Sequence, residues 1–138
     1  MSYDLNVYLK RSAMPSPSAW KKAILDAQFP VELYEDFNVE SFTGFLPAPA
    51  NGEKSGFEYY SSALTAEDIA ELELAPDLDF SVQFTIGSAP MELVSALAAA
   101  SVLAAVSGGW LYDPQEDDMV AAGDAIDWAK TQLAQVSQ

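Results

Sequence analysis

The stretch FSVQFTIGSAPMELVSALAAASVLAAVSGG, residues 80–109, decides which fold the sequence predicts. Its first seven residues alternate between apolar and polar side chains, which is typical of a strand with one buried face. Pro90 then begins a helix that runs to Ser107 and ends at the Gly108-Gly109 pair. Since this helix is apolar almost all round and rich in alanine, we expect it to lie buried between the sheet and another helix.

Similar patterns on either side of this strand and helix predict further strands and helices. Strands are expected at residues 3–10, 31–34, 56–62 and 110–112. Helices are expected at residues 17–29, 65–72 and 122–136, and residues 35–55 are rich in turn signals. Because most strands alternate, we predict an α+β fold: a two-layer sandwich with a mainly antiparallel sheet of about 4–5 strands and helices packed on one face. The length of 138 residues favours a single domain, residues 1–138.

The composition excludes several classes of function. The chain has 21 acidic and 6 basic residues, with no His and no Cys, and its formal charge is −15. Thiol and imidazole catalysis, disulfides and Cys/His metal sites are therefore impossible. Because a nucleic-acid-binding protein needs a basic surface, nucleic acid is not expected as a partner.

The start of the chain and its longest apolar run bear on where the protein works. MSYDLNVYLKR, residues 1–11, lacks the basic start and the continuous apolar stretch of a signal peptide. The longest apolar run, Leu93–Val106, is shorter than the ~20 residues that a membrane span needs. The absence of Cys fits a reducing compartment. We therefore expect a cytoplasmic protein with no membrane partner.

The negative charge is concentrated in the later part of the chain. Between Ser55 and Ala129 there are fourteen acids and no base, whereas five of the six bases lie in the first 54 residues. Intramolecular ion pairs cannot neutralise such a stretch, so its field must face water or a basic partner. A solvated acidic surface that keeps the protein soluble is the simpler interpretation, and a basic protein partner is the functional one.

No group of residues matches a known catalytic or cofactor motif. Without His or Cys, an enzyme would depend on carboxylates, serine with lysine, tyrosine or a carboxylate-bound metal. The acidic loop 113–118 is the best candidate for a hard cation, but its spacing lacks the glycine and the closing glutamate of a calcium loop. We therefore predict no catalytic residue, no metal site and no cofactor. A carboxylate- or metal-dependent enzyme remains the third hypothesis.

Three tyrosines fall in the polar register of predicted strands and suggest an interaction surface. If the register holds, Tyr8, Tyr34 and Tyr60 lie on the open face of the sheet. Their expected neighbours are Asp4, Glu32, Glu58, Ser81 and Gln83. Tyrosine is enriched at interfaces, and acids around it would steer a basic partner toward this face. The alternatives are that tyrosine merely suits half-exposed strands, or that the last helix covers part of this face.

Five segments carry a resemblance that extends over most of the chain. They are residues 3–10, Met14-Pro15 with Trp20, residues 56–60, residues 79–84 and residues 108–115. Together they resemble a group of small, mostly uncharacterised acidic bacterial proteins, some of which are similar to immunity proteins of secreted antibacterial toxins. The resemblance implies a small acidic cytosolic protein that binds and blocks a toxin, and it implies no individual site residue.

The first hypothesis is therefore an immunity or inhibitor protein that occludes a basic toxin domain. The partner-binding residues that we predict are Tyr8, Tyr34, Glu58, Tyr60, Asp113, Glu116, Asp117 and Asp118. Toxins that act on nucleic acids tend to have basic clefts, which an acidic, tyrosine-bearing surface can fill. The second hypothesis is a non-catalytic adaptor or scaffold domain, and one form of it is a homodimer through the open sheet face.

Overall fold

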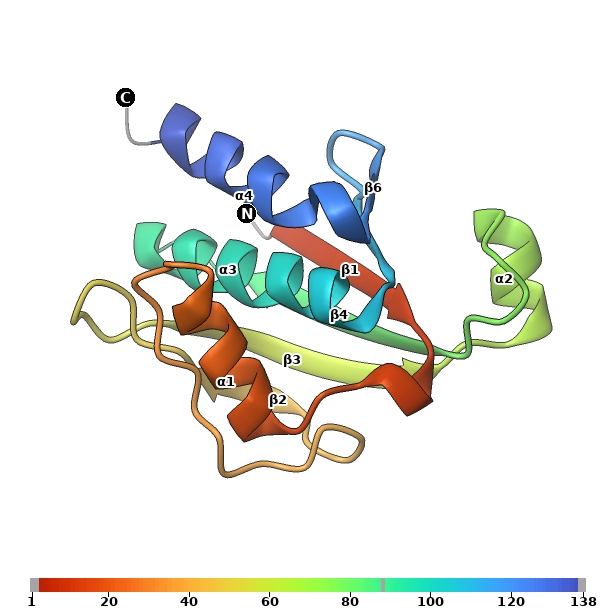
Figure 1. Ribbon diagram of the computed structural model, residues 1–138, viewed down its shortest axis with the longest axis horizontal. Coiled ribbons are helices and arrows are strands. Elements are labelled where there is room, and N and C mark those ends of the chain that lie inside the picture. Colours follow the sequence, from red (N-terminus) through yellow and green to blue (C-terminus); the bar gives the residue numbers. More distant parts are fainter. Residues whose placement is uncertain (1–2, 88, 137–138) are drawn as a thin grey trace.

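The computed structural model describes residues 3–87 and 89–136 as an α+β fold built on one antiparallel sheet (Figure 1). The strands are β1 Tyr3–Leu9, β2 Gly44–Pro47, β3 Gly56–Ala63, β4 Phe80–Ile86, β5 Trp110–Asp113 and β6 Asp118–Ala121. They lie in the order β2-β3-β4-β1-β5-β6, and every neighbouring pair is antiparallel. The predicted class is confirmed, although the sheet has six strands and is larger than the sequence predicted.

Most of the helices form a layer on one face of this sheet. The layer consists of α1 Pro17–Asp26, α3 Pro90–Ser107 and α4 Ala122–Val136, with α3 between the other two (Figure 1). A short 3-10 helix, η1 Arg11–Ala13, leads from β1 toward α1. The remaining helix, α2 Ala66–Leu72, stands apart from the layer, where the chain passes from β3 to β4 (Figure 1).

Alternation along the central strands decides which side chains form the core. Leu5 of β1 lies opposite Phe84 of β4, and both are fully buried beneath the helices. The ring of Trp20 in α1 packs edge-on against Phe84, with 6.0 Å between the ring centroids. Its indole N–H donates to the carbonyl of Ala99 at 3.0 Å, so the same side chain joins α1 to both α3 and the sheet.

The apolar helix α3 lies at the centre of the core, as predicted. Its residues from Ser95 to Ala104 are buried, and it contacts α1, α4 and the strands beneath it. Its length and composition would also suit a membrane span, but 56% of that stretch is buried inside the fold. The buried Ser95 hydroxyl donates to the carbonyl of Ala48 at 2.6 Å and lies 2.7 Å from the hydroxyl of Ser55, so its polarity is satisfied.

Capping residues begin two helices where the sequence predicts them. The Ser16 side chain accepts the backbone N–H of Ala19, and Pro17 is the first residue of α1. Thr65 and Asp68 form a reciprocal capping box at the start of α2. Each cap satisfies backbone N–H groups that have no partner inside the helix.

Residues 31–34 do not form the predicted strand, because they make only an isolated bridge. The backbone N–H groups of Glu32 and Tyr34 donate to the carbonyls of Pro49 and Pro47. Proline has no N–H group with which to return these bonds, so the ladder is one-sided. The segment therefore runs beside β2 without completing a strand pair.

The two edge strands, β2 and β6, lie in segments for which the sequence predicts no strand. β2 lies within the turn-rich residues 35–55 and pairs with β3. β6 follows the acidic turn directly, with Val120 opposite Leu111 of β5, and passes into α4 without a connecting loop. Each strand has four residues, which cover only two periods of alternation and leave little pattern in the sequence.

Candidate interaction surface

The sheet face opposite α1, α3 and α4 presents the alternate residues of the strands, and we call it the open face (Figure 1). Its residues are Asp4, Asn6, Tyr8, Phe45, Glu58, Tyr60, Ser62, Ser81, Gln83, Thr85, Trp110, Tyr112, Met119 and Ala121. Four large side chains on it are well exposed: Phe45 at 51%, Tyr60 at 39%, Trp110 at 38% and Met119 at 39%. Exposed aromatic residues gathered on one face are typical of protein-binding surfaces.

The open face is acidic and aromatic, with no positive charge in its strands. None of the six strands that the structure describes contains Lys or Arg. Glu58 lies opposite Phe45 on one side and Thr85 on the other, and the Tyr60 hydroxyl donates to the Glu58 carboxylate at 3.3 Å. The charge of Glu58 raises the pKa of Tyr60, so this phenol remains a hydrogen-bond donor at neutral and mildly alkaline pH.

Of the three predicted tyrosines, Tyr60 lies exposed on a strand of the open face. Tyr8 points to the same face, but it is only 6% exposed and the ring of Tyr112 lies 6.4 Å away. Burial raises the pKa of Tyr8, and the charges of Tyr112 and Asp68 raise it further. Tyr8 therefore offers little surface to a partner.

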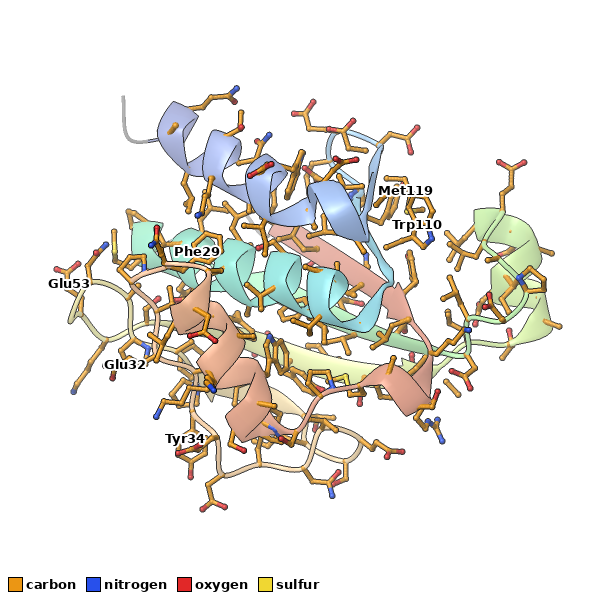
Figure 2. All side chains as sticks on the ribbon, viewed as in Figure 1. Phe29, Glu32, Tyr34, Glu53, Trp110 and Met119 are labelled. Atoms are coloured by element: carbon orange, nitrogen blue, oxygen red, sulfur yellow. The ribbon has the colours of Figure 1, made fainter. Side chains whose placement is uncertain are left out.

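Tyr34 and Glu32 lie beyond β2, outside the six strands of the sheet, but the predicted alternation holds, because Val31 and Leu33 between them are buried. They belong to the segment beside β2 that does not form a strand, and both are exposed. They line a hollow with Lys21, whose ammonium group lies 3.7 Å from the carboxylate of Glu35. Figure 2 shows Glu32 and Tyr34 far from Trp110, beside β2 at the other end of the sheet.

Phe45, Trp110 and Met119 also belong to the open face, and the sequence predicts no binding role for them. Trp110 shares its face with Tyr112 through simple alternation in β5, and this signal was present in the sequence. Phe45 and Met119 lie in the short edge strands, where the sequence shows no clear periodicity. Only the pairing of these edges with β3 and β5 reveals which way the two side chains point.

The acidic loop 113–118 closes the β5–β6 hairpin, and its carboxylates are partly buried and partly exposed. Asp113 is fully buried and accepts hydrogen bonds from the Tyr3 hydroxyl at 2.8 Å and from the backbone N–H and side-chain amide of Gln115. Burial, followed by the bond to Asp113, raises the pKa of Tyr3. Asp113 therefore fastens the hairpin to β1 and is not accessible to a partner.

The other three acids of this turn, Glu116, Asp117 and Asp118, are exposed. Asp117 has a left-handed backbone, with φ of 53°, and its carboxylate accepts the Tyr112 hydroxyl at 2.8 Å. This hydrogen bond raises the pKa of Tyr112 and holds the Asp117 side chain against the open face. Within residues 3–87 and 89–136, no group of three or more Asp and Glu side chains is arranged to hold a metal ion.

A groove separates the β5–β6 hairpin from α2 and the segment that follows it, and we call it the α2–hairpin groove. Its central hollow, of about 140 Å³, is lined by Glu73, Leu74, Ala75, Trp110 and Met119. A second hollow shares Glu73 and Met119 and adds Glu71, Leu72, Tyr112 and Asp117. A third shares Ala75 and Trp110 and adds Lys10, Ala13, Asp77, Leu78, Ser107 and Gly108. Figure 2 shows Trp110 and Met119 pointing from the hairpin toward α2.

The basic residue of this groove is already engaged by an acid. The Lys10 ammonium lies 2.9 Å from the carboxylate of Asp77, and this ion pair raises the pKa of Lys10 and lowers that of Asp77. In the part of the chain that the structure describes, no ion pair reaches Glu71, Glu73 or Asp117. Their negative charge therefore faces water or a partner.

Comparison of the chain with models of protein families, with curated protein sequences and with solved structures found no significant match. A function is therefore inferred from the chemistry of the surfaces themselves. The two with the clearest chemistry are the exposed aromatic residues of the open face and the acid-lined α2–hairpin groove at one end of it.

Proposed function

We propose that the protein is an immunity-type inhibitor, which works in the cytoplasm and blocks a basic toxin domain by covering it with the open face. The observation that carries this proposal is the composition of that face. It exposes Phe45 and Tyr60 beside Glu58 and Trp110 farther along the same face, and its strands contain no Lys or Arg. Such a surface offers aromatic anchors together with a field of one sign, which suits a basic partner.

The two kinds of residue contribute differently to binding. The formal charge of −15 accelerates encounter with a basic protein, and salt weakens this effect because the Debye length is about 10 Å at 0.1 M ionic strength. Exposed ion pairs contribute only about 0–1 kcal/mol each, so charge alone does not give tight binding. The affinity should come mainly from burial of the exposed aromatic side chains.

The test uses the full chain and the toxin domain encoded beside its gene. We expect co-expression to restore growth of cells that produce the toxin, and the purified proteins to bind with an affinity that falls as salt rises. Tyr60→Ala and Glu58→Lys should each weaken binding about tenfold, because the first removes an exposed aromatic ring and the second reverses the charge beside it. Asp127→Lys is the matched control, since Asp127 is exposed on α4, in the helix layer on the other side of the sheet.

The outcomes distinguish specific binding by the open face from an acidic surface that only keeps the protein soluble. Absence of binding at low salt contradicts the proposal. So does an affinity that is unchanged by salt, by Tyr60→Ala and by Glu58→Lys. Equal losses from Glu58→Lys and Asp127→Lys would also contradict it, because the effect would then follow total charge and not the open face.

A second copy of the chain is the alternative occupant of the open face, as in a scaffold dimer. In a two-fold dimer the same patch meets itself, so Glu58 and the other acids would approach like charges. This repulsion favours a basic partner over self-association. Light scattering at high protein concentration and low salt tests the choice: a monomer supports the inhibitor, and a dimer supports the scaffold.

A further inference from the structure

The α2–hairpin groove holds an exposed indole beside carboxylates. Trp110 lines both the central hollow and the hollow toward Lys10, so it stands where the two meet. Met119 lies in the neighbouring strand β6 and completes the apolar wall of the central hollow. Both side chains are more than one-third exposed, at 38% and 39%, although burial of such side chains is strongly favourable. The groove therefore offers apolar surface that a partner can cover.

The three hollows of the groove differ in size. The central hollow has a volume of about 140 Å³, and the hollows toward Lys10 and toward Glu71 have volumes of about 490 and 380 Å³. The central hollow accommodates one side chain of a larger partner. Two further hollows continue on either side of it, so an extended segment can lie along the groove with one side chain inserted at its centre.

The charge of the lining selects a cation. Glu73 lines the central hollow, while Glu71 and Asp117 line the hollow next to it. Lys10, in the hollow on the other side, is paired with Asp77 at 2.9 Å. The field at the indole is therefore negative, and a positively charged side chain is its complement.

Arginine fits this combination better than lysine does. Its guanidinium group is planar, stacks on an indole ring and retains in-plane N–H donors for a carboxylate. Lysine carries a compact, strongly hydrated charge that loses more solvation on entering an apolar wall. An indole with a carboxylate at the same hollow thus discriminates between the two basic side chains.

We propose that the α2–hairpin groove binds an extended basic segment of a partner protein and seats one arginine side chain on the indole of Trp110, with Glu73 as its ion-pair acceptor. The inference rests on the proposed function for the identity of the partner, but the chemistry of the groove stands by itself. Glu71 and Asp117 attract further basic residues of the same segment. Because α2 has no fully buried residue, this wall of the groove can adjust without disturbing the core.

The probe is a short fluorescein-labelled peptide of alternating arginine and serine, with binding to the full chain measured by fluorescence anisotropy. The matched peptides replace arginine by citrulline, which keeps its shape without the charge, or by lysine. We expect the citrulline peptide to bind about tenfold more weakly and the lysine peptide about threefold more weakly. Equal affinity for the arginine and citrulline peptides overturns the inference.

Variants then locate the arginine site. Trp110→Leu keeps an apolar side chain but removes the aromatic ring, and Glu73→Gln removes only the charge, so each should weaken the arginine peptide about threefold to tenfold. The control is Glu53→Gln, which removes one charge at the far end of the molecule (Figure 2) and should leave the affinity unchanged. If Trp110→Leu does not fold, as judged by circular dichroism, the exposed Glu73 carries the test.

The outcomes distinguish this inference from the proposed function. One outcome is toxin binding that depends on Tyr60 and Glu58 but is unchanged by Trp110→Leu and Glu73→Gln. This result overturns the inference of an arginine site in the groove and leaves the proposed function intact. Arginine-selective peptide binding that depends on Trp110, with no affinity for the toxin domain, supports the groove and overturns only the proposed function. Equal losses from Glu73→Gln and Glu53→Gln overturn the groove, since the effect would then follow total charge.

Discussion

The two faces of the central strands are formed by alternate residues of the same segments: one residue points to the helices and the next points to the open face. On the helix-covered face, Leu5 lies opposite Phe84 and both are fully buried. On the open face, the next residues along, Asn6 and Gln83, lie opposite each other and reach solvent. Stability and the proposed binding therefore depend on alternate residues of the same strands, so one can be altered with little effect on the other.

The strongest test of this comparison exchanges neighbouring residues of β4 for alanine. Phe84→Ala should lower the free energy of unfolding by about 3–5 kcal/mol, because it leaves a cavity between Trp20 and Phe57, whose rings lie 6.0 and 5.0 Å from its own. Gln83→Ala should change it by less than about 0.5 kcal/mol. Urea unfolding monitored by circular dichroism measures both, and similar losses would mean that the open face is also part of the core.

The β5–β6 hairpin offers a second test, because two aspartates lie directly opposite each other in its register. Asp113 is fully buried, whereas Asp118 is exposed. Asp113→Ala leaves the Tyr3 hydroxyl and the Gln115 amide without their acceptor, so we expect a loss of about 1–3 kcal/mol in the free energy of unfolding. Asp118→Ala should be close to neutral. A larger loss from Asp118→Ala would show that the buried carboxylate does not fasten the hairpin to β1.

These two faces also show what the sequence could and could not predict. The alternation of β4 and the apolar character of α3 are local patterns, and the structure has both elements where they were expected. The capping residues Ser16 and Thr65 act on neighbouring N–H groups, so α1 and α2 were equally predictable. For these elements the sequence pattern and the final packing agree.

The failures have a common cause, which is dependence on a distant partner. Residues 31–34 have the composition of a strand, but the partner segment contains prolines that cannot return its hydrogen bonds. The burial of Asp113 depends on Tyr3, which lies 110 positions away in the chain. The ring of Tyr8 lies 6.4 Å from that of Tyr112, which belongs to a distant part of the chain. None of these relations has a period or a motif within its own segment.

A third test compares the N-terminal caps of two helices: α1, which belongs to the helix layer, and α2, which stands apart from it. Thr65→Ala should cost α2 about 1 kcal/mol, and because no residue of α2 is fully buried, the loss should remain local. Hydrogen exchange of the α2 amides should then accelerate about fivefold while the amides of β1 and β4 are unchanged. Ser16→Ala is the matched change in α1, which buries Trp20 and Ile24 and should lower global stability instead. Equal global losses from the two variants would contradict the separation.

The smallest expected effect is a pH dependence confined to the same helix. The backbone N–H of Thr65 donates to the Asp68 carboxylate at 3.0 Å, and this bond lowers the pKa of Asp68 from its ordinary value of 3.8. Because this pKa is lower in the folded state, the carboxylate contributes stability above pH 3.8, and the contribution disappears as the pH falls through the lower folded value. The Thr65 amide, followed by NMR, should therefore titrate with a midpoint below 3.8, and the transition should be absent in Asp68→Asn. A midpoint at the ordinary value would mean that α2 is already frayed, and the groove wall that it forms would then be ordered only by a partner.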